Sequence, residues 1–235
     1  MLTENVQRKS GDGMSKYVCV FCDERKSDDT AHIINDKNGI CLSCSEELSH
    51  TPPSLPYSGT KNISYIMSPF EYNGKLRKTI VDFKFNNCRS YAALFADMMC
   101  PYLDSYNMWD TFDYIIPVPL HAIRLKNRGY NQSDLISRYL SEYLHIPHKT
   151  DGFIRTRATK RQSTLNGLAR TENVRGAFQC TENFTGKRIL LFDDICTTAN
   201  TLESCAVTLK DSGAEYICAL TLAIHVSQKI PILTY

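Results

Sequence analysis

The chain has 235 residues, 43% of them hydrophobic, which is enough for one good core plus a small appendage. A net charge of +2 gives no global field that argues for nucleic acid, and no run of eighteen apolar residues argues for a membrane span. Residues 1–15 are polar and lack the apolar segment of a secretory signal, so we interpret the ten cysteines as thiols and metal ligands in a reducing cytoplasm. We expect residues 1–16 to be disordered.

Two C-x-x-C knuckles lie within residues 17–50, and eighteen residues separate them. Each knuckle lets two thiolates approach one ion, and tetrahedral zinc closes four such ligands. The polar segment between the knuckles is too poor in apolar residues to form a core, so zinc would supply the folding energy. A redox C-x-x-C, the alternative, needs only one pair and a βαβ setting. We therefore predict a structural zinc module with the ligands Cys19, Cys22, Cys41 and Cys44.

Three prolines, two serines and a glycine in residues 51–60 predict a stiff linker. It separates the zinc module from a second domain, which we place at 61–235. Residues 64–72 suggest a short hairpin or strand, and apolar residues near helical spacing predict helices over 75–84 and 90–103.

Residues 113–120 predict the next strand, which two prolines end because proline cannot sit inside a ladder. The segment 121–130 reads as a loop with three basic residues and no acid, followed by a helix that starts at 131–133. A basic loop beside a helix N-terminus suits a pyrophosphate, whereas an exposed surface turn is the simpler interpretation of this loop taken alone.

The segment 155–175 holds six basic residues and one acid, which predicts a mobile loop or hairpin after a short strand. Such a segment can close on a multi-phosphate ligand or bind a polynucleotide backbone. Few aromatic residues interrupt it, so no base-stacking platform is evident. The candidate residues for pyrophosphate or a DNA backbone are Arg124, Arg128, Arg157, Lys160, Arg161 and Arg170.

A run near the end of the chain, RILLFDDICTTANT, starts at Arg188. It predicts a buried parallel strand over 189–192, two carboxylates at the strand end, and a helix from about 198 to 211. A further strand over 216–224 completes a doubly wound α/β pattern. Because ligands bind at the carboxyl ends of strands and anions at helix starts, the run describes a ribose 5-phosphate pocket. The alternative is a strand end before a capped helix that needs no ligand.

This run resembles the phosphoribosyl pyrophosphate (PRPP) loop of type I phosphoribosyltransferases. The resemblance implies that Asp193 and Asp194 are the catalytic acids that face the ribose 2- and 3-hydroxyls, and that Mg²⁺ accompanies PRPP. It also implies which residues wrap the 5-phosphate: Thr197, Thr198, Ala199, Asn200 and Thr201. Family loops usually carry glycine at the position of Ala199, because glycine permits a positive φ and close ligand approach. Alanine is the smallest substitute, so we expect phosphate binding to be kept.

Several motifs in one order resemble the ComF family of bacterial competence proteins (ComFC/GntX type) over about residues 17–223. After the paired C-x-x-C module come Tyr72-x-Gly74 with Leu76-Arg77, Phe83-Lys-Phe85, Ile116-Pro-Val-Pro-Leu120, Arg128-Gly-Tyr-Asn-Gln132, Arg155-x-Arg157 with Gln162, Arg170-x-x-Asn173-Val174-x-Gly176-Ala-Phe178 and the Asp193-Asp194 loop. The resemblance implies a type I phosphoribosyltransferase-like doubly wound parallel sheet with a small zinc-ribbon-like module at its N-terminus.

The resemblance also implies a cytoplasmic factor for natural transformation that handles incoming single-stranded DNA. It implies action with a competence helicase and recombination proteins, which would bring the chain to the inner face of the membrane. Two functions stay open on the residues. We favour a competence factor that binds PRPP and DNA, and the alternative is an active phosphoribosyltransferase acting on a nucleobase or a nucleic-acid-related acceptor.

Overall fold

The computed structural model describes residues 17–26, 30–35, 38–49, 57–58, 60–158 and 176–225. The residues that we predicted to be disordered, most of the predicted linker and most of the basic segment after residue 155 lie outside these ranges. Lys160, Arg161 and Arg170 are therefore outside the described residues, whereas Arg124, Arg128 and Arg157 are within them.

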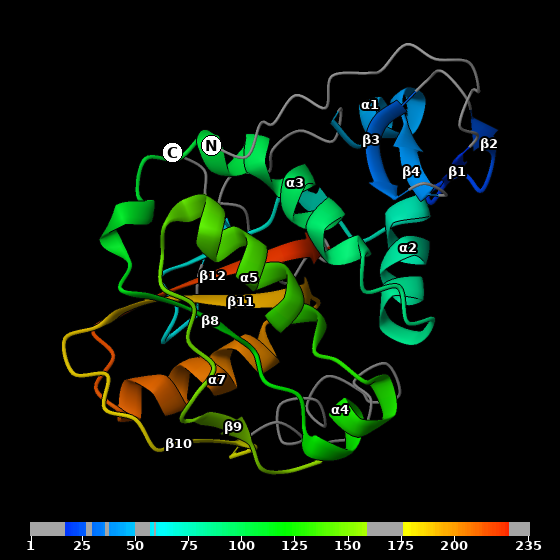
Figure 1. Cartoon of the computed structure of the whole chain (residues 1–235). Helices are drawn as coiled ribbons and strands as arrows, with labels where there is room; N and C mark the ends of the chain where they lie inside the picture. Colours follow the sequence, from blue (N-terminus) through cyan, green and yellow to red (C-terminus); the bar gives the residue numbers. More distant parts are fainter. Residues whose placement is uncertain are drawn as a thin grey trace.

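A six-stranded sheet forms the centre of the larger domain (Figure 1). Its order is β5-β6-β12-β11-β8, and the short β7 also pairs with β12. All the pairings are parallel except that of β5, which is an antiparallel edge strand. The strands are β5 (Tyr57–Ser58), β6 (Tyr65–Met67), β7 (Phe70–Glu71), β8 (Tyr114–Pro117), β11 (Arg188–Cys196) and β12 (Tyr216–Ile224).

Helices cover both faces of this sheet, with α3 (Tyr91–Asp104) and α5 (Gln132–Leu144) on one face and α7 (Asn200–Asp211) on the other (Figure 1). Alternate residues of β11 serve the two faces: Leu190 and Phe192 lie in the cluster with α3 and α5, and Ile189 and Leu191 in the cluster with α7. A parallel sheet buried on both faces confirms the predicted α/β class. No helix of the described ranges combines the length and the apolar composition needed to cross a bilayer.

Two smaller sheets complete the described part of the chain. A hairpin of β9 (Phe153–Arg155) and β10 (Phe178–Cys180) packs against α7. A four-stranded sheet in the order β2-β1-β4-β3 carries the cysteine knuckles. Its elements are β1 (Tyr17–Cys19), β2 (Arg25–Lys26), β3 (Thr30–Asn35), β4 (Asn38–Cys41) and the helix α1 (Leu42–Ser49).

The cysteine module packs directly on helix α2 (Gly74–Phe85), as Figure 1 shows. Val20 and Phe21 of the module share one apolar cluster with Leu76 and Ile80 of the helix. The Thr79 hydroxyl donates a hydrogen bond of 3.1 Å to the Val20 carbonyl oxygen. The module and the larger domain therefore share a buried apolar contact.

Two local predictions are wrong. The segment that we predicted as a basic loop forms a helix, α4 (Ala122–Arg128), because His121 caps its start and Gly129, at φ 77°, ends it. The strand predicted to end at residue 192 continues to residue 196, because β12 pairs with it along its whole length. Residues 64–72, for which we predicted a short hairpin or strand, hold two short strands, β6 and β7, that each pair with β12 and not with one another.

Candidate functional site

The acid pair lies where β11 continues beyond the end of its neighbour β8. Phe192 pairs with Pro117, the last residue of β8, and Asp193 is the first residue of β11 beyond that partner. On its other side Asp193 pairs with Thr221 of β12, so the backbone stays extended. The two acids are therefore held by a central strand at the carboxyl edge of the sheet, where open α/β folds bind ligands.

Asp193 is held by two hydrogen bonds on a single carboxylate oxygen. Its Oδ1 accepts from the Ser133 hydroxyl at 2.9 Å and from the Asp194 backbone N–H at 2.9 Å. Burial and the neighbouring charge of Asp194 raise the pKa of Asp193 to about 7, although Lys84 and the hydrogen bonds act in the opposite direction. This carboxyl group therefore changes charge near neutral pH.

Asp194 makes an ion pair with Lys84, the last basic residue of α2. Lys84 Nζ lies 2.8 Å from Asp194 Oδ2, and the two side chains are only 15% and 12% exposed. The cation comes from the end of α2, the helix that also packs against the cysteine module. Charges this far from water persist only when they are paired.

The turn after the acid pair has the features of an anion site. Ala199 takes a left-handed conformation, with φ 55° and ψ −1°, and α7 begins at the next residue without a side-chain cap. The first N–H groups of a helix have no partner within the helix, so an uncapped start leaves donors for a ligand. Thr198 Oγ1 is buried without a hydrogen bond to any described residue. The carboxylate of Glu203 in the first turn is engaged by Thr60 and Asn62.

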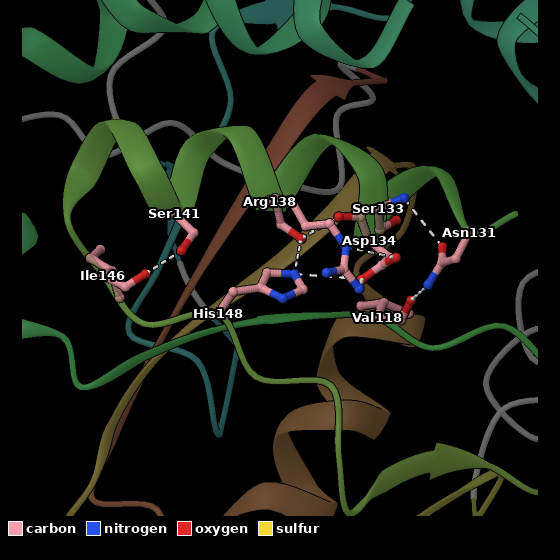
Figure 2. Close-up of polar contacts among 9 residues, drawn as sticks. Val118, Asn131, Ser133, Asp134, Arg138, Ser141, Ile146 and His148 are labelled. Atoms are coloured by element: carbon pink, nitrogen blue, oxygen red, sulfur yellow. Dashed lines mark hydrogen bonds and ion pairs between the residues drawn. The ribbon is translucent and has the colours of Figure 1, made fainter. Parts of the chain in front are cut away.

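Ser133, in the first turn of α5, supplies the hydroxyl that contacts Asp193. Figure 2 draws the polar contacts that hold this helix start in place. The Asn131 side chain accepts from the Ser133 backbone N–H at 3.2 Å and donates to the Val118 carbonyl oxygen at 3.0 Å. One amide group thus caps the helix and ties it to the segment that leaves β8. Ser133 is therefore aimed at the acid pair by the cap of its own helix.

The basic residues predicted from the sequence are only partly gathered around this site. Arg128 Nη1 donates to Gln132 Oε1 at 2.8 Å, and its guanidinium lies 5.1 Å from the centre of the Phe85 ring. Arg128 is thereby fixed against Gln132, the chain neighbour of Ser133, and against Phe85, the chain neighbour of Lys84. Arg124 lies one turn earlier on α4, and the exposed Arg157 lies two residues past β9.

Two further polar features lie apart from the acid pair. His148 contacts Ser137 Oγ at 2.9 Å and Asp134 Oδ1 at 3.6 Å through the same ring nitrogen, Nε2, so it is not arranged to pass a proton between them (Figure 2). Burial lowers the pKa of His148. An open surface hollow lies at the far end of α7, lined by Glu182, Asn183, Thr185, Asp211, Ser212 and Gly213.

The four cysteines of the two knuckles form one cluster, with all four Sγ atoms within 4.8 Å of one another. Tetrahedral Zn²⁺ with Zn–S bonds of about 2.3 Å separates its sulfurs by about 3.8 Å. Cys22 Sγ and Cys41 Sγ are 4.0 Å apart, so the cluster fits a zinc ion with little adjustment. The cluster can hold a metal ion, as the knuckle spacing predicts.

Sequence reasoning missed Lys84, Ser133 and Gln132. Lys84 stands in the Phe83-Lys-Phe85 stretch, but only the fold shows that its helix ends beside β11. Ser133 and Gln132 open the helix after Arg128, and the signal for them was the Asn131 cap. Gln132 is 1% exposed, and its Nε2 lacks a hydrogen bond to the described part of the chain.

Solved structures similar to this chain include phosphoribosyltransferases. A purine phosphoribosyltransferase from Pyrococcus horikoshii gives a TM-score of 0.32 with 19% identity, covering 58% of this chain and 73% of that one. An orotate phosphoribosyltransferase from Mycobacterium tuberculosis gives a TM-score of 0.35 with 16% identity, covering 77% and 83%.

No family model matches the chain. Competence protein F of Haemophilus influenzae is 38% identical over 112 residues, 46% of this chain and 49% of that protein. The DNA utilization protein YhgH of Salmonella typhimurium is 27% identical over 191 residues, 78% and 83% of the two chains. Competence protein ComFC of Bacillus subtilis is 24% identical across 92% and 99%. The match spans about half the length of the first relative. The chain is therefore a homologue of bacterial proteins named for competence and DNA utilization.

Proposed function

We propose that this chain is a competence factor that handles incoming single-stranded DNA during transformation and binds PRPP with Mg²⁺ in a phosphoribosyltransferase-like pocket. The observation that carries the pocket is the acid pair at the carboxyl edge of β11, followed at once by the uncapped start of α7. The competence role is supported by the names of the homologues.

The acid pair and the turn suit the two ends of a ribose 5-phosphate. Carboxylates accept hydrogen bonds, so Asp193 and Asp194 would take the 2- and 3-hydroxyls of the ribose. Thr197, Thr198 and Thr201 would surround the 5-phosphate together with the backbone N–H groups of Ala199 and Asn200. The buried Thr198 hydroxyl, which lacks a hydrogen bond to the described residues, gains a partner in this arrangement.

Mg²⁺ fits this donor set as a ligand-borne ion. The four cysteines are the one group of three or more potential ligands gathered among the described residues, so the acid side offers only two carboxylates. Mg²⁺ prefers oxygen ligands, keeps several waters and is commonly held by one or two carboxylates plus substrate phosphates. When bound, it would neutralise charge on the pyrophosphate. Asp193 and Asp194 would orient the sugar.

Thermal unfolding with PRPP, with and without Mg²⁺, tests the pocket. A ligand that binds only the folded chain raises its midpoint, so we expect a Mg²⁺-dependent rise in the wild type. Asp194→Asn removes one acceptor charge and should abolish the rise, while Glu182→Gln, in the surface hollow at the far end of α7, should leave it unchanged. A wild type that shows no shift contradicts PRPP binding.

Salt dependence tests DNA binding. Each neutralised phosphate of a single strand contributes about −0.7 to the slope of log affinity against log salt. Replacing Arg157, Lys160 and Arg161 together by alanine should therefore flatten the slope by about 2. An unchanged slope removes these residues from the DNA surface.

The same pocket would also serve phosphoribosyl transfer, the alternative function. Ala199 takes the left-handed conformation that glycine usually provides, so the substitution does not prevent the turn from forming. Release of pyrophosphate from PRPP with a nucleobase or nucleic-acid acceptor distinguishes an enzyme from a binding factor. Release by the wild type and none by Asp194→Asn would assign the activity to this site.

A further inference from the structure

The ion pair between Lys84 and Asp194 is costly for the fold and therefore calls for a reason. Both side chains are largely removed from water, at 15% and 12% exposed. Replacing such a pair by apolar residues is often neutral or stabilising, so a buried pair is weak support for a purely structural role. On the same helix, the pair of Lys78 and Asp23 is 46% and 67% exposed and carries no such cost.

The position of Lys84 ties it to the chemistry of the acid pair. Its charge lowers the pKa of Asp193, against the rise that burial and Asp194 produce. The groups that face Asp193 come from five elements: Lys84 of α2, Ser133 of α5, Arg155 of β9, Cys205 of α7, and Asp194 and Cys196 of β11. Lys84 touches the acid pair directly, through its ammonium group on Asp194.

Helix α2 is fixed at both ends. At its start, Lys75 Nζ lies 3.6 Å from Cys44 Sγ, and in its middle Thr79 donates to the Val20 carbonyl oxygen of the cysteine module. At its end, the Tyr130 hydroxyl donates to the Phe83 carbonyl oxygen. Because a helix is stiff over three turns, these contacts determine where Lys84 stands.

We propose that Lys84 is a positioning residue of the phosphoribosyl pocket: its ammonium group holds Asp194 for the ribose hydroxyls, and helix α2 holds Lys84 there from the four-cysteine module. The role rests on the PRPP binding proposed above. An ammonium group has three donors, and one of them on Asp194 fixes the carboxylate while leaving its other oxygen to accept from a hydroxyl. The module thus acts on the pocket as a support for one side chain.

The pH dependence of PRPP affinity tests the role. Protonated Asp193 becomes a donor and loses acceptor capacity, so affinity in the wild type should fall as the pH drops through about 7. In Lys84→Met the cation that lowers this pKa is gone, so the fall should begin at a higher pH. We also expect a loss of about 10- to 100-fold in affinity at neutral pH. Lys84→Arg should keep the wild-type profile in large part.

Lys78→Met is the matched control, because it removes the same charge from the same helix at an exposed pair. Its profile should superimpose on that of the wild type. The role is overturned if Lys84→Met binds PRPP with wild-type affinity and its affinity falls at the same pH as that of the wild type. A loss that is equal at every pH and is not rescued by arginine also overturns it, since that is what a merely structural pair would give. A wild type that binds no PRPP refutes the pocket itself and is recognised before any variant is compared.

A double-mutant cycle tests the support from the module. Thr79→Val removes the hydroxyl that contacts the Val20 carbonyl oxygen and, within α2, the Lys75 carbonyl oxygen, while keeping a similar volume. It should weaken PRPP binding about two- to fivefold in the wild type, through the lost tie between α2 and the module, and should add nothing in the Lys84→Met background. Equal losses in both backgrounds show that α2 does not act through Lys84 and overturn that half of the proposal.

Discussion

The four-cysteine cluster and the acid pair both lie against helix α2, but they are assembled in different ways. All four thiols come from two knuckles in the first sheet and the helix that follows it. The acid pair depends on Lys84 from α2 and on Ser133 from α5, sixty residues before Asp193. The cluster is thus a property of local spacing, whereas the acid pair gains its partners only once the parallel sheet has brought distant helix ends together.

Loss of a cluster ligand should have the largest effect. Cys19→Ser should abolish metal binding and lower the free energy of unfolding by more than about 4 kcal/mol, because metal affinity is folding free energy in such modules. Cys88→Ser, outside the cluster, is the control and should change little. Metal analysis and urea unfolding measure both. Equal stability of the two variants would show that the module folds without its metal.

Breaking the buried ion pair on one side should be the next largest effect. Asp194→Ala leaves Lys84 buried without its partner and should cost about 3–5 kcal/mol in urea unfolding. The double variant Lys84→Met with Asp194→Leu should recover most of that loss, because it removes both charges. Lys78→Met, at the exposed pair, should cost less than about 1 kcal/mol. A double variant as unstable as Asp194→Ala would show that the pair itself stabilises the fold.

The acid pair should also make stability depend on pH. The folded pKa of Asp193, about 7, lies above its ordinary value of 3.8. Between these two pH values the folded state therefore holds a proton that the unfolded chain releases. The stabilisation by this group is complete below about pH 4 and is lost as the pH rises through 7. Relative to Asp193→Asn, the wild type should therefore lose free energy of unfolding across that window. Parallel curves for the two proteins would contradict the raised pKa.

The smallest effect concerns the turn before α7. Ala199→Gly should stabilise the chain by about 1 kcal/mol, because glycine takes the left-handed conformation without the steric cost that alanine bears. Ala206→Gly, in the middle of the same helix, should have the opposite sign, since glycine is a poor helix former. Thermal unfolding measures both. A destabilised Ala199→Gly would mean that the turn relaxes away from this conformation.

The comparison explains what the sequence could predict. The cysteine ligands and the sequence from the acids into α7 follow from runs of adjacent residues, and both α7 and β12 lie close to their predicted bounds. Helix α4 could not be predicted from periodicity, because none of its residues is buried and Ile123 and Leu125 are exposed. The end of β11 was missed because its extension depends on pairing with β12, which sequence spacing does not reveal.

The role of Lys84 could not be predicted from the sequence for a different reason. A lysine beside Phe85, which is 52% exposed, at the end of an amphipathic helix, predicts a solvated charge. Only the packing of α2 between the cysteine module and the acid pair turns it inward. Ser133 likewise reads as an ordinary first-turn residue until the parallel sheet places α5 over β11.

A crystal structure of the chain with PRPP and Mg²⁺ would show directly whether the acid pair and the start of α7 form the proposed pocket. We expect the ribose hydroxyls within hydrogen-bond distance of the carboxylates of Asp193 and Asp194, and the 5-phosphate on the N–H groups at the start of α7. Lys84 should remain on Asp194 and bring it to the sugar. Ligand bound elsewhere, with the acid pair closed on Lys84 as in the free chain, would contradict PRPP binding at this site.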